Sequence, residues 1–214
     1  MTHEQRKLVE ILVWISQLGD NVQNLPKEAQ KIHQSAAEKF RKINSRELEA
    51  ILTQDESETV SLLDSNSFVY LPPIEKGGCF VPILCIEYNF DAETPIVSLK
   101  VALFLMVEND GKDELKAIGY RFETPHKHSR HHYYHLQPID GFDRSDRWKL
   151  PGSEWVPTNY PAFPLDAEDP IELLICLLVS LYDLKIIKAI RDIKDNFINK
   201  TIKNLKLHHF IAGV

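Results

Sequence analysis

Histidine is concentrated in one short segment of this 214-residue chain. Five of the nine histidines lie between residues 126 and 135, at positions 126, 128, 131, 132 and 135. The imidazole group titrates near neutral pH, ligates metals and transfers protons, a combination that no other unperturbed side chain offers there. We therefore expect any site of chemistry in this protein to include this segment.

Side chains alternate between the two faces of a β-strand, and this alternation predicts which side chains of the segment share a face. A hairpin turn over 124–130 would place Glu123 opposite His131 and Arg121 opposite Tyr133. These side chains would then share one face of the two paired strands. The sequence thus predicts one polar patch, made of Arg121, Glu123, His131, Tyr133, His135 and Gln137.

This patch has the residue types that metal-free RNA cleavage needs. The reaction requires a base for the 2′-hydroxyl, an acid for the leaving oxygen and a cation for the charge on phosphorus. His131 or His135 could form the acid–base pair with Glu123, and Arg121 could hold the phosphate through two hydrogen bonds. The catalytic candidates are Arg121, Glu123, His131, Tyr133 and His135, and the substrate-binding candidates are Arg130 and Gln137.

A metal site is a second interpretation of the same segment. Its candidate ligands are His126, His128, His131 and His135, with Glu123 beside them, enough for zinc, manganese or iron. The spacing matches no closed structural zinc pattern, so the sequence requires no cofactor and a divalent metal stays a hypothesis. A third interpretation is a histidine-rich surface hairpin that carries out no chemistry.

A separate motif, Glu114-Leu115-Lys116, has the Glu-x-Lys form of a metal-dependent nuclease. Asp91 or Glu87 could add the second carboxylate that holds Mg²⁺ in such a site. Strand parity, however, places Glu114 and Lys116 on the face of Phe122, away from the predicted patch. They also follow a turn, so we interpret them as solvated charges.

Composition and charge narrow the class of protein. A hydrophobic fraction of 43% and a charged fraction of 26% are typical of a globular chain that folds without metal or disulfides. The net charge of −6 argues against a general duplex-DNA binder. The three cysteines have apolar neighbours, which predicts reduced, buried thiols.

The chain has no segment that predicts secretion or membrane insertion. Its first residues lack the uncharged run of a signal peptide. The most apolar window, 171–182, is shorter than the roughly twenty residues that a membrane span needs. We therefore expect a soluble, cytoplasmic protein with no membrane partner.

Apolar spacing in the first part of the chain predicts helices. We expect one over 3–24, a second from Pro26 to Phe40, and a third over 44–52 that begins with an Asn44–Glu47 capping box. The acidic stretch that follows predicts a loop with a short helix near 60–63.

The middle of the chain predicts a four-stranded antiparallel meander. Its strands are expected over 80–90, 96–107, 115–122 and 131–139. Pro82 favours an edge position for the first strand, and Asn109–Lys112 predicts the hairpin turn between the second and third.

The last part of the chain predicts a proline-rich crossing over 151–170, then a buried helix over 171–182 and a basic helix over 184–205. The apolar anchors of the crossing are Trp155, Tyr160 and Phe163. The basic outer face of the last helix fits an RNA or partner surface, or a solvated face. The charged run 143–147 before Trp148 is interpreted as turn-forming ion pairs.

Together these elements predict one α+β domain over 1–214, with N-terminal helices, the meander, and two C-terminal helices packed on one sheet face. Its parts are a helical region (1–65), an antiparallel sheet (66–140), the crossing (141–170) and the C-terminal helices (171–206).

The segments 119–123 (Gly-Tyr-Arg-Phe-Glu) and 131–137 (His-His-Tyr-Tyr-His-Leu-Gln) resemble a known pattern. It is the Arg-x-(Asp/Glu) pair and His-rich strand of small bacterial toxin-type proteins such as the TumE-like family. The chain is also similar to uncharacterised defence-island proteins in which such a segment precedes a proline-rich stretch and a buried helix. The resemblance implies a prokaryotic interference role with RNA cleavage, and it carries over to Arg121, Glu123 and His135.

Two functions therefore stand side by side, and whether the protein is an enzyme stays open. The first is a cytosolic toxin- or defence-type protein that acts on RNA through the patch. The second is a non-catalytic interaction module or accessory subunit, whose hairpin and helices bind a protein partner such as an antitoxin. A metal-dependent enzyme is the third.

Overall fold

The computed structural model describes most of the chain up to residue 192. The described residues are 3–20, 25–53, 59–75, 77–89, 96–125, 134–154, 156, 162–165, 167 and 169–192. The stretch 126–133, which holds four of the five clustered histidines, and the chain beyond 192 lie outside them.

Four α-helices form in the described residues. They are α1 (His3–Asp20), α2 (Lys27–Ala37), α3 (Ser45–Leu52) and α4 (Pro170–Asp192). The predicted capping box begins α3: Glu47 N donates to Asn44 Oδ1 at 2.9 Å, and Asn44 N donates to Glu47 Oε2 at 3.2 Å. The second predicted helix is shorter at both ends, because Pro26 is the N-cap residue of α2 and Phe40 lies past its end.

The strands form one mixed sheet, so the α+β class is confirmed but the predicted sheet is too small. The order in the described part is β1-β3-β4-β5-β6-β7-β8, with β2 also paired to β4. The pairing of β1 with β3 is parallel and the others are antiparallel. The strands are β1 (Arg41–Lys42), β2 (Thr59–Ser61), β3 (Ser67–Tyr70), β4 (Val81–Asn89), β5 (Ile96–Asn109), β6 (Lys112–Glu123), β7 (His135–Ile139) and β8 (Phe163–Pro164).

Short strands on both sides enlarge the sheet beyond a meander. β4 to β7 are consecutive neighbours, but β2 and β3 pair with β4, and β8 pairs with β7. The edge position predicted from Pro82 is therefore wrong, because Leu71 N donates to Pro82 O at 2.9 Å. The short helix expected near 60–63 is also wrong, since 59–61 form β2. Pairing of this segment with β4, which is distant in sequence, outweighed the local preference for a helix.

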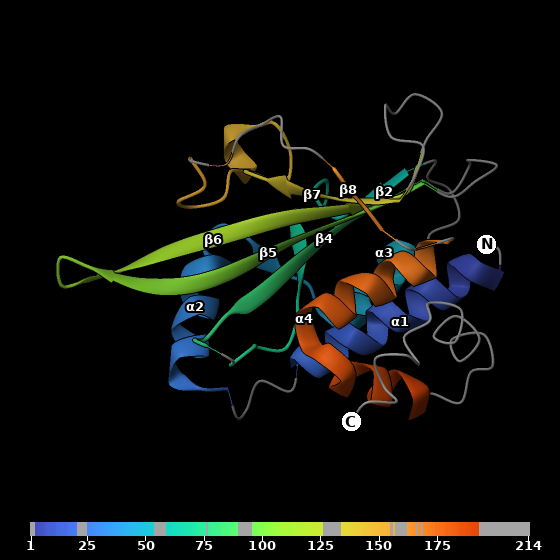
Figure 1. The fold of residues 1–214 in the computed structure, drawn as a ribbon, viewed down its shortest axis with the longest axis horizontal. Helices are drawn as coiled ribbons and strands as arrows, with labels where there is room; N and C mark the ends of the chain where they lie inside the picture. Colours follow the sequence, from blue (N-terminus) through green and yellow to red (C-terminus); the bar gives the residue numbers. More distant parts are fainter. Residues whose placement is uncertain are drawn as a thin grey trace.

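The β5–β6 hairpin has the predicted turn. Asp110 and Gly111 have φ values of 51° and 73°, and a type I′ turn requires positive φ at both central positions. Both strands run longer than predicted. In Figure 1 the hairpin extends to the side of the molecule opposite α1 and α4, which pack against each other.

The face of the sheet that carries Lys100 and Arg121 has these two charged residues at one end and an aromatic cluster at the other. Those two residues lie directly opposite each other, as do Phe104 and Ala117 further along the same face. An aromatic cluster covers the Phe104 end, with ring centroids 5.0–6.3 Å apart. It consists of Phe40, Phe68, Phe104, Phe142 and Trp148. We call this face, including its Lys100 end, the site face.

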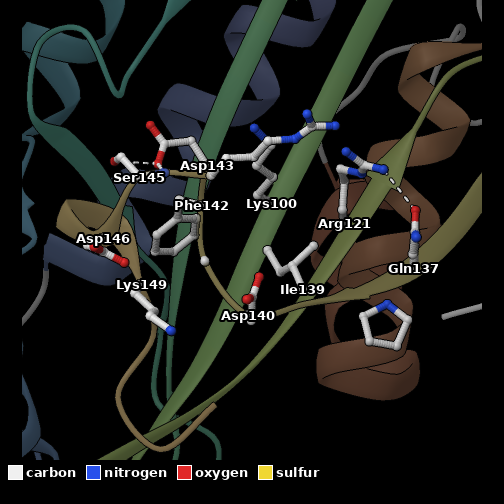
Figure 2. A pocket seen from close by; sticks show the side chains of 13 residues that line it. Lys100, Arg121, Gln137, Ile139, Asp140, Phe142, Asp143, Ser145, Asp146 and Lys149 are labelled. Atoms are coloured by element: carbon white, nitrogen blue, oxygen red, sulfur yellow. Dashed lines mark hydrogen bonds between the residues drawn. The ribbon is translucent and has the colours of Figure 1, made fainter. Parts of the chain in front are cut away.

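The opposite face of the sheet packs on a helix. Leu99, Val101 and Phe122 on this face are buried, and α4 contacts β5 and β6. In Figure 2, which looks onto the site face, α4 lies behind the strands. The prediction that Phe122 would pack away from the polar patch is therefore confirmed.

The C-terminal part differs from the predicted pair of helices. α4 runs unbroken from Pro170 to Asp192, and the rest of the predicted basic helix lies outside the described residues. Phe163 belongs to β8 and is 51% exposed, so it is not the buried anchor that we predicted. Trp155 and Tyr160 lie outside the described residues. Across the described chain, no helix combines the length and apolar character of a membrane span.

Candidate functional site

The polar patch forms where β6 pairs with β7, in a register four residues from the predicted one. Glu123 lies directly opposite His135, and Arg121 lies opposite Gln137. The expected partners, His131 and Tyr133, precede β7 and lie outside the described residues. Because the shift is an even number of residues, the paired side chains still share one face.

One carboxylate joins the two strands. Oε2 of Glu123 lies 3.3 Å from Nε of Arg121 and 3.3 Å from Nε2 of His135. Nη2 of Arg121 also donates to Oε1 of Gln137 at 2.8 Å. The Arg121 and Glu123 side chains are 32% and 15% exposed, but that of His135 is only 1% exposed. Solvent therefore reaches Arg121 and Glu123, while His135 contacts Glu123 from within the protein.

Lys100 continues this row of charges onto β5. It lies directly opposite Arg121 on β6, and its ammonium group is 2.8 Å from Oε2 of Glu87. The Lys100 side chain is only 9% exposed, and a charge that is so enclosed needs a partner, which Glu87 provides. Lys100 and Arg121 thus place two positive charges on neighbouring strands.

A pocket of about 660 Å³ opens over these two cations. Lys100, Arg121 and Gln137 line it from the sheet, and Figure 2 shows Arg121 directed toward Gln137, with Asp143 and Ser145 on the other side of Lys100. Residues 138–146 and Lys149 complete the lining, which is polar and carries both signs of charge. A cavity of this size can hold a nucleotide-sized ligand. We call it the cation pocket.

Close packing on the sheet holds the wall of the cation pocket. A Cβ atom at Gly119 of β6 would lie 2.7 Å from Cγ1 of Ile139, and closer still to Cδ1 of Leu150. Only glycine leaves room for the wall at this point. Leu150 N donates to Asp140 O at 2.8 Å, and this bond closes the segment into a loop on the sheet.

Most of the pocket wall was not assigned to a site by the sequence. The run 143–147 was predicted as turn-forming, and Asp143 does form a turn: its Oδ1 accepts from Ser145 N at 2.8 Å and from Ser145 Oγ at 2.7 Å. The same run also lines the cation pocket. Lys100 was missed as well, although a lysine within a nearly continuous apolar strand was a usable signal, because lysine is rarely buried without a partner.

The other predicted site residues, His126, His128, Arg130, His131 and Tyr133, lie outside the described residues. The described part of the predicted metal site is therefore His135 with Glu123. Within the described ranges, no three His, Cys, Asp or Glu side chains gather closely enough to hold a metal ion. The metal interpretation stays a prediction.

Glu114 and Lys116 form the solvated pair that we expected. Oε2 of Glu114 lies 3.0 Å from Nζ of Lys116, and Asn109 donates to the same carboxyl group. These contacts, first the hydrogen bond from Lys116, hold the pKa of Glu114 below its usual value. The register places the pair on the opposite face from Lys100 and its partner Glu87.

The three cysteines are not in disulfides. Cys79 and Cys85 are buried and Cys176 is half-buried. Burial is the main cause that raises the pKa of the Cys79 and Cys85 thiols. A thiol with a raised pKa is a poor nucleophile at neutral pH, which favours a structural role for both.

No family model matches this chain, and neither a curated protein nor a solved structure matches it. The resemblance to TumE-like proteins thus stays a prediction that depends on residues 119–137.

Proposed function

We propose that this protein binds RNA in the cation pocket and cleaves it without a metal ion. The observation that carries the proposal is the carboxylate of Glu123, which lies 3.3 Å from both Arg121 and His135. Arg121 lines the cation pocket, so the carboxylate that it contacts lies next to a space that can hold a phosphate. The contact supports a joint role for Glu123 and Arg121, with His135 behind the carboxylate.

The cations beneath the pocket suit a phosphate group. Lys100 and Arg121 are neighbours across β5 and β6, and both line the cation pocket. Gln137 accepts a hydrogen bond from Arg121, which fixes the plane of the guanidinium before a ligand arrives. A planar donor held in this way can stabilise the extra charge of the phosphorane-like transition state.

In the proposed reaction, Glu123 takes the proton of the 2′-hydroxyl group. The 2′-oxygen forms a bond to phosphorus while the bond from phosphorus to the 5′-oxygen breaks, and the leaving oxygen gains a proton. We assign this proton to His131, one of the two histidines that could form the acid–base pair with Glu123. His135 is almost fully buried, so we assign it to positioning Glu123 rather than to contact with RNA.

An RNA-cleaving protein of this kind fits the toxin- or defence-type role that the resemblance implies. Such an activity harms the cell that produces it unless a partner restrains it. The proposal therefore includes a protein antitoxin or an equivalent regulator.

The burial of His135 favours a second candidate, a non-catalytic interaction module. In that case the contact between Glu123 and His135 only joins β6 to β7. Exposed apolar side chains such as Phe163 would then contact a protein partner. A metal-dependent enzyme would need ligands from 126–133 in addition to these two residues.

The test is degradation of a mixed RNA pool by the purified full-length protein, with and without EDTA. We expect cleavage that survives EDTA and falls about 100-fold or more in Glu123→Gln, as loss of a general base predicts. Arg121→Gln should also reduce cleavage. Glu114→Gln is the matched control, because it changes a carboxylate on the other face of the same strand.

Each alternative has its own result in this assay. Cleavage that EDTA abolishes would contradict the metal-free mechanism and support a metal-dependent nuclease. No cleavage under either condition would overturn the proposal and favour the interaction module.

A further inference from the structure

A second, open pocket of about 480 Å³ adjoins the cation pocket. The turn between β2 and β3 and the segment 143–148 form its sides, with Glu87 of β4 between them. Asp143 lines both pockets, and Glu87 of the second is ion-paired with Lys100 of the first at 2.8 Å. The two pockets therefore adjoin at Asp143 and at the ion pair between Glu87 and Lys100.

The second pocket differs from the cation pocket in charge. Its lining includes the carboxylates of Asp64, Glu87 and Asp143, against the single cation Arg147. A phosphate would be repelled here, whereas a neutral group with several hydrogen-bond donors would find acceptors. The cation pocket, by contrast, has four cations (Lys100, Arg121, Arg144 and Lys149) against the carboxylates of Asp140, Asp143 and Asp146.

Arg147 gives the second pocket a fixed planar surface. Its guanidinium carbon lies 4.6 Å from the centroid of the Trp148 ring, and Nη2 donates to Oδ1 of Asn66. Asn66 has a φ of 53°, and Ser67 N closes the turn around it by donating to Leu62 O at 2.9 Å. Arginine planes held in this way are surfaces on which proteins stack the bases of single-stranded RNA.

We propose that the second pocket is a nucleobase subsite, which prefers guanine, beside a phosphate held in the cation pocket. Guanine carries its ring N–H and its amino group side by side, and one carboxylate can accept from both. We assign this role to the exposed Asp64, because Glu87 is ion-paired with Lys100 and Asp143 accepts hydrogen bonds from Ser145. Uracil has one ring donor between two acceptors, so it satisfies the same carboxylate less well.

This inference rests on the proposed function, since it takes RNA as the ligand. It adds that the protein recognises a base in the second pocket as well as a phosphate in the cation pocket. The carboxylates supply the preference and the cations supply affinity that is independent of sequence. The two contributions can therefore be separated by mutation.

The experiment measures binding of the full-length protein to the dinucleotides GpG and UpU, with 2′-O-methyl groups that block cleavage. We expect GpG to bind about tenfold more tightly than UpU, within the range of one bidentate base contact. Asp64→Asn should remove this preference by weakening GpG more than UpU, because the single ring donor of uracil depends less on this carboxylate. Arg121→Gln should weaken both dinucleotides alike, and Glu114→Gln should change neither.

The results distinguish this inference from the proposal beneath it. Equal affinity for GpG and UpU, or a preference that survives Asp64→Asn, would overturn the base subsite while RNA binding stands. If neither dinucleotide binds and the RNA pool stays intact, the proposed function itself fails and the subsite fails with it.

Discussion

The carboxylate of Glu123 on β6 contacts the imidazole of His135 on β7, with Oε2 and Nε2 3.3 Å apart. The two residues lie directly opposite each other, and Pro164 of β8 lies opposite His135 on its other side. Arg121 contacts the same carboxylate oxygen. A substitution at one of these three residues should therefore change how much the other two contribute to stability, because contacts that share an atom are energetically coupled.

Replacement of His135 tests how much this contact stabilises the protein. We expect His135→Ala to lower the free energy of unfolding by about 1–3 kcal/mol, because it removes a buried polar contact and leaves a void. His135→Gln keeps a donor and should recover part of the loss. Urea unfolding followed by circular dichroism measures both. Equal stability of His135→Ala and the wild type would show that the contact contributes nothing.

The pH dependence of stability should include a contribution from His33 on α2. Its ring lies 4.9 Å from that of Tyr70, and burial, with a smaller effect of Lys42, lowers its pKa from 6.5 to about 4. Between these values the unfolded chain binds a proton that the folded protein does not. The contribution of His33 to the free energy of unfolding is therefore fully present above pH 6.5 and is lost as the pH falls toward 4.

Urea unfolding between pH 7 and pH 4 measures this contribution. The side chain is only partly buried, so we discount the full effect of the pKa shift to about 1–2 kcal/mol over the interval. His33→Gln should have a flatter profile than the wild type in this interval alone. Parallel profiles for the two proteins would contradict the lowered pKa.

Gly119 should tolerate no side chain, because the wall of the cation pocket packs directly on it. We expect Gly119→Ala to cost about 1–3 kcal/mol, as overpacking does, and to displace the wall. Gly77→Ala is a useful comparison, since φ there is 78° but no atom lies within 4 Å of the new Cβ. It should cost only the strain of a left-handed backbone, about 1 kcal/mol. Thermal unfolding of the two variants compares them, and equal costs would refute the packing argument.

The buried cysteines should react slowly with thiol reagents in the folded protein. Burial raises the pKa of Cys79 and Cys85, so little thiolate forms at pH 7 and reagents have poor access. We expect labelling by a disulfide-exchange reagent to become fast only after denaturant is added. Rapid native labelling of Cys85, identified by mass spectrometry, would contradict this expectation.

The sequence by itself determined the parts of the fold that depend on neighbouring residues. The Asn44–Glu47 capping box begins α3 as predicted, and Asp110-Gly111 makes the turn of the β5–β6 hairpin. Each signal joins residues within about four positions, so it operates before the chain has its final shape. Alternation along a strand is equally local, so the sequence placed Arg121 and Glu123 on a common face of β6, and His135 and Gln137 on a common face of β7.

Only the tertiary structure decided which side chains meet. Parity permits any even shift of β7 along β6, and the observed register brings His135, not His131, opposite Glu123. Lys100 joins the site through pairing across β5 and β6, and 59–61 become a strand only beside β4. The cation pocket likewise exists because the segment after β7 folds back over Gly119. These contacts join residues distant in sequence, and their selection depends on packing of the whole sheet, which no local pattern contains.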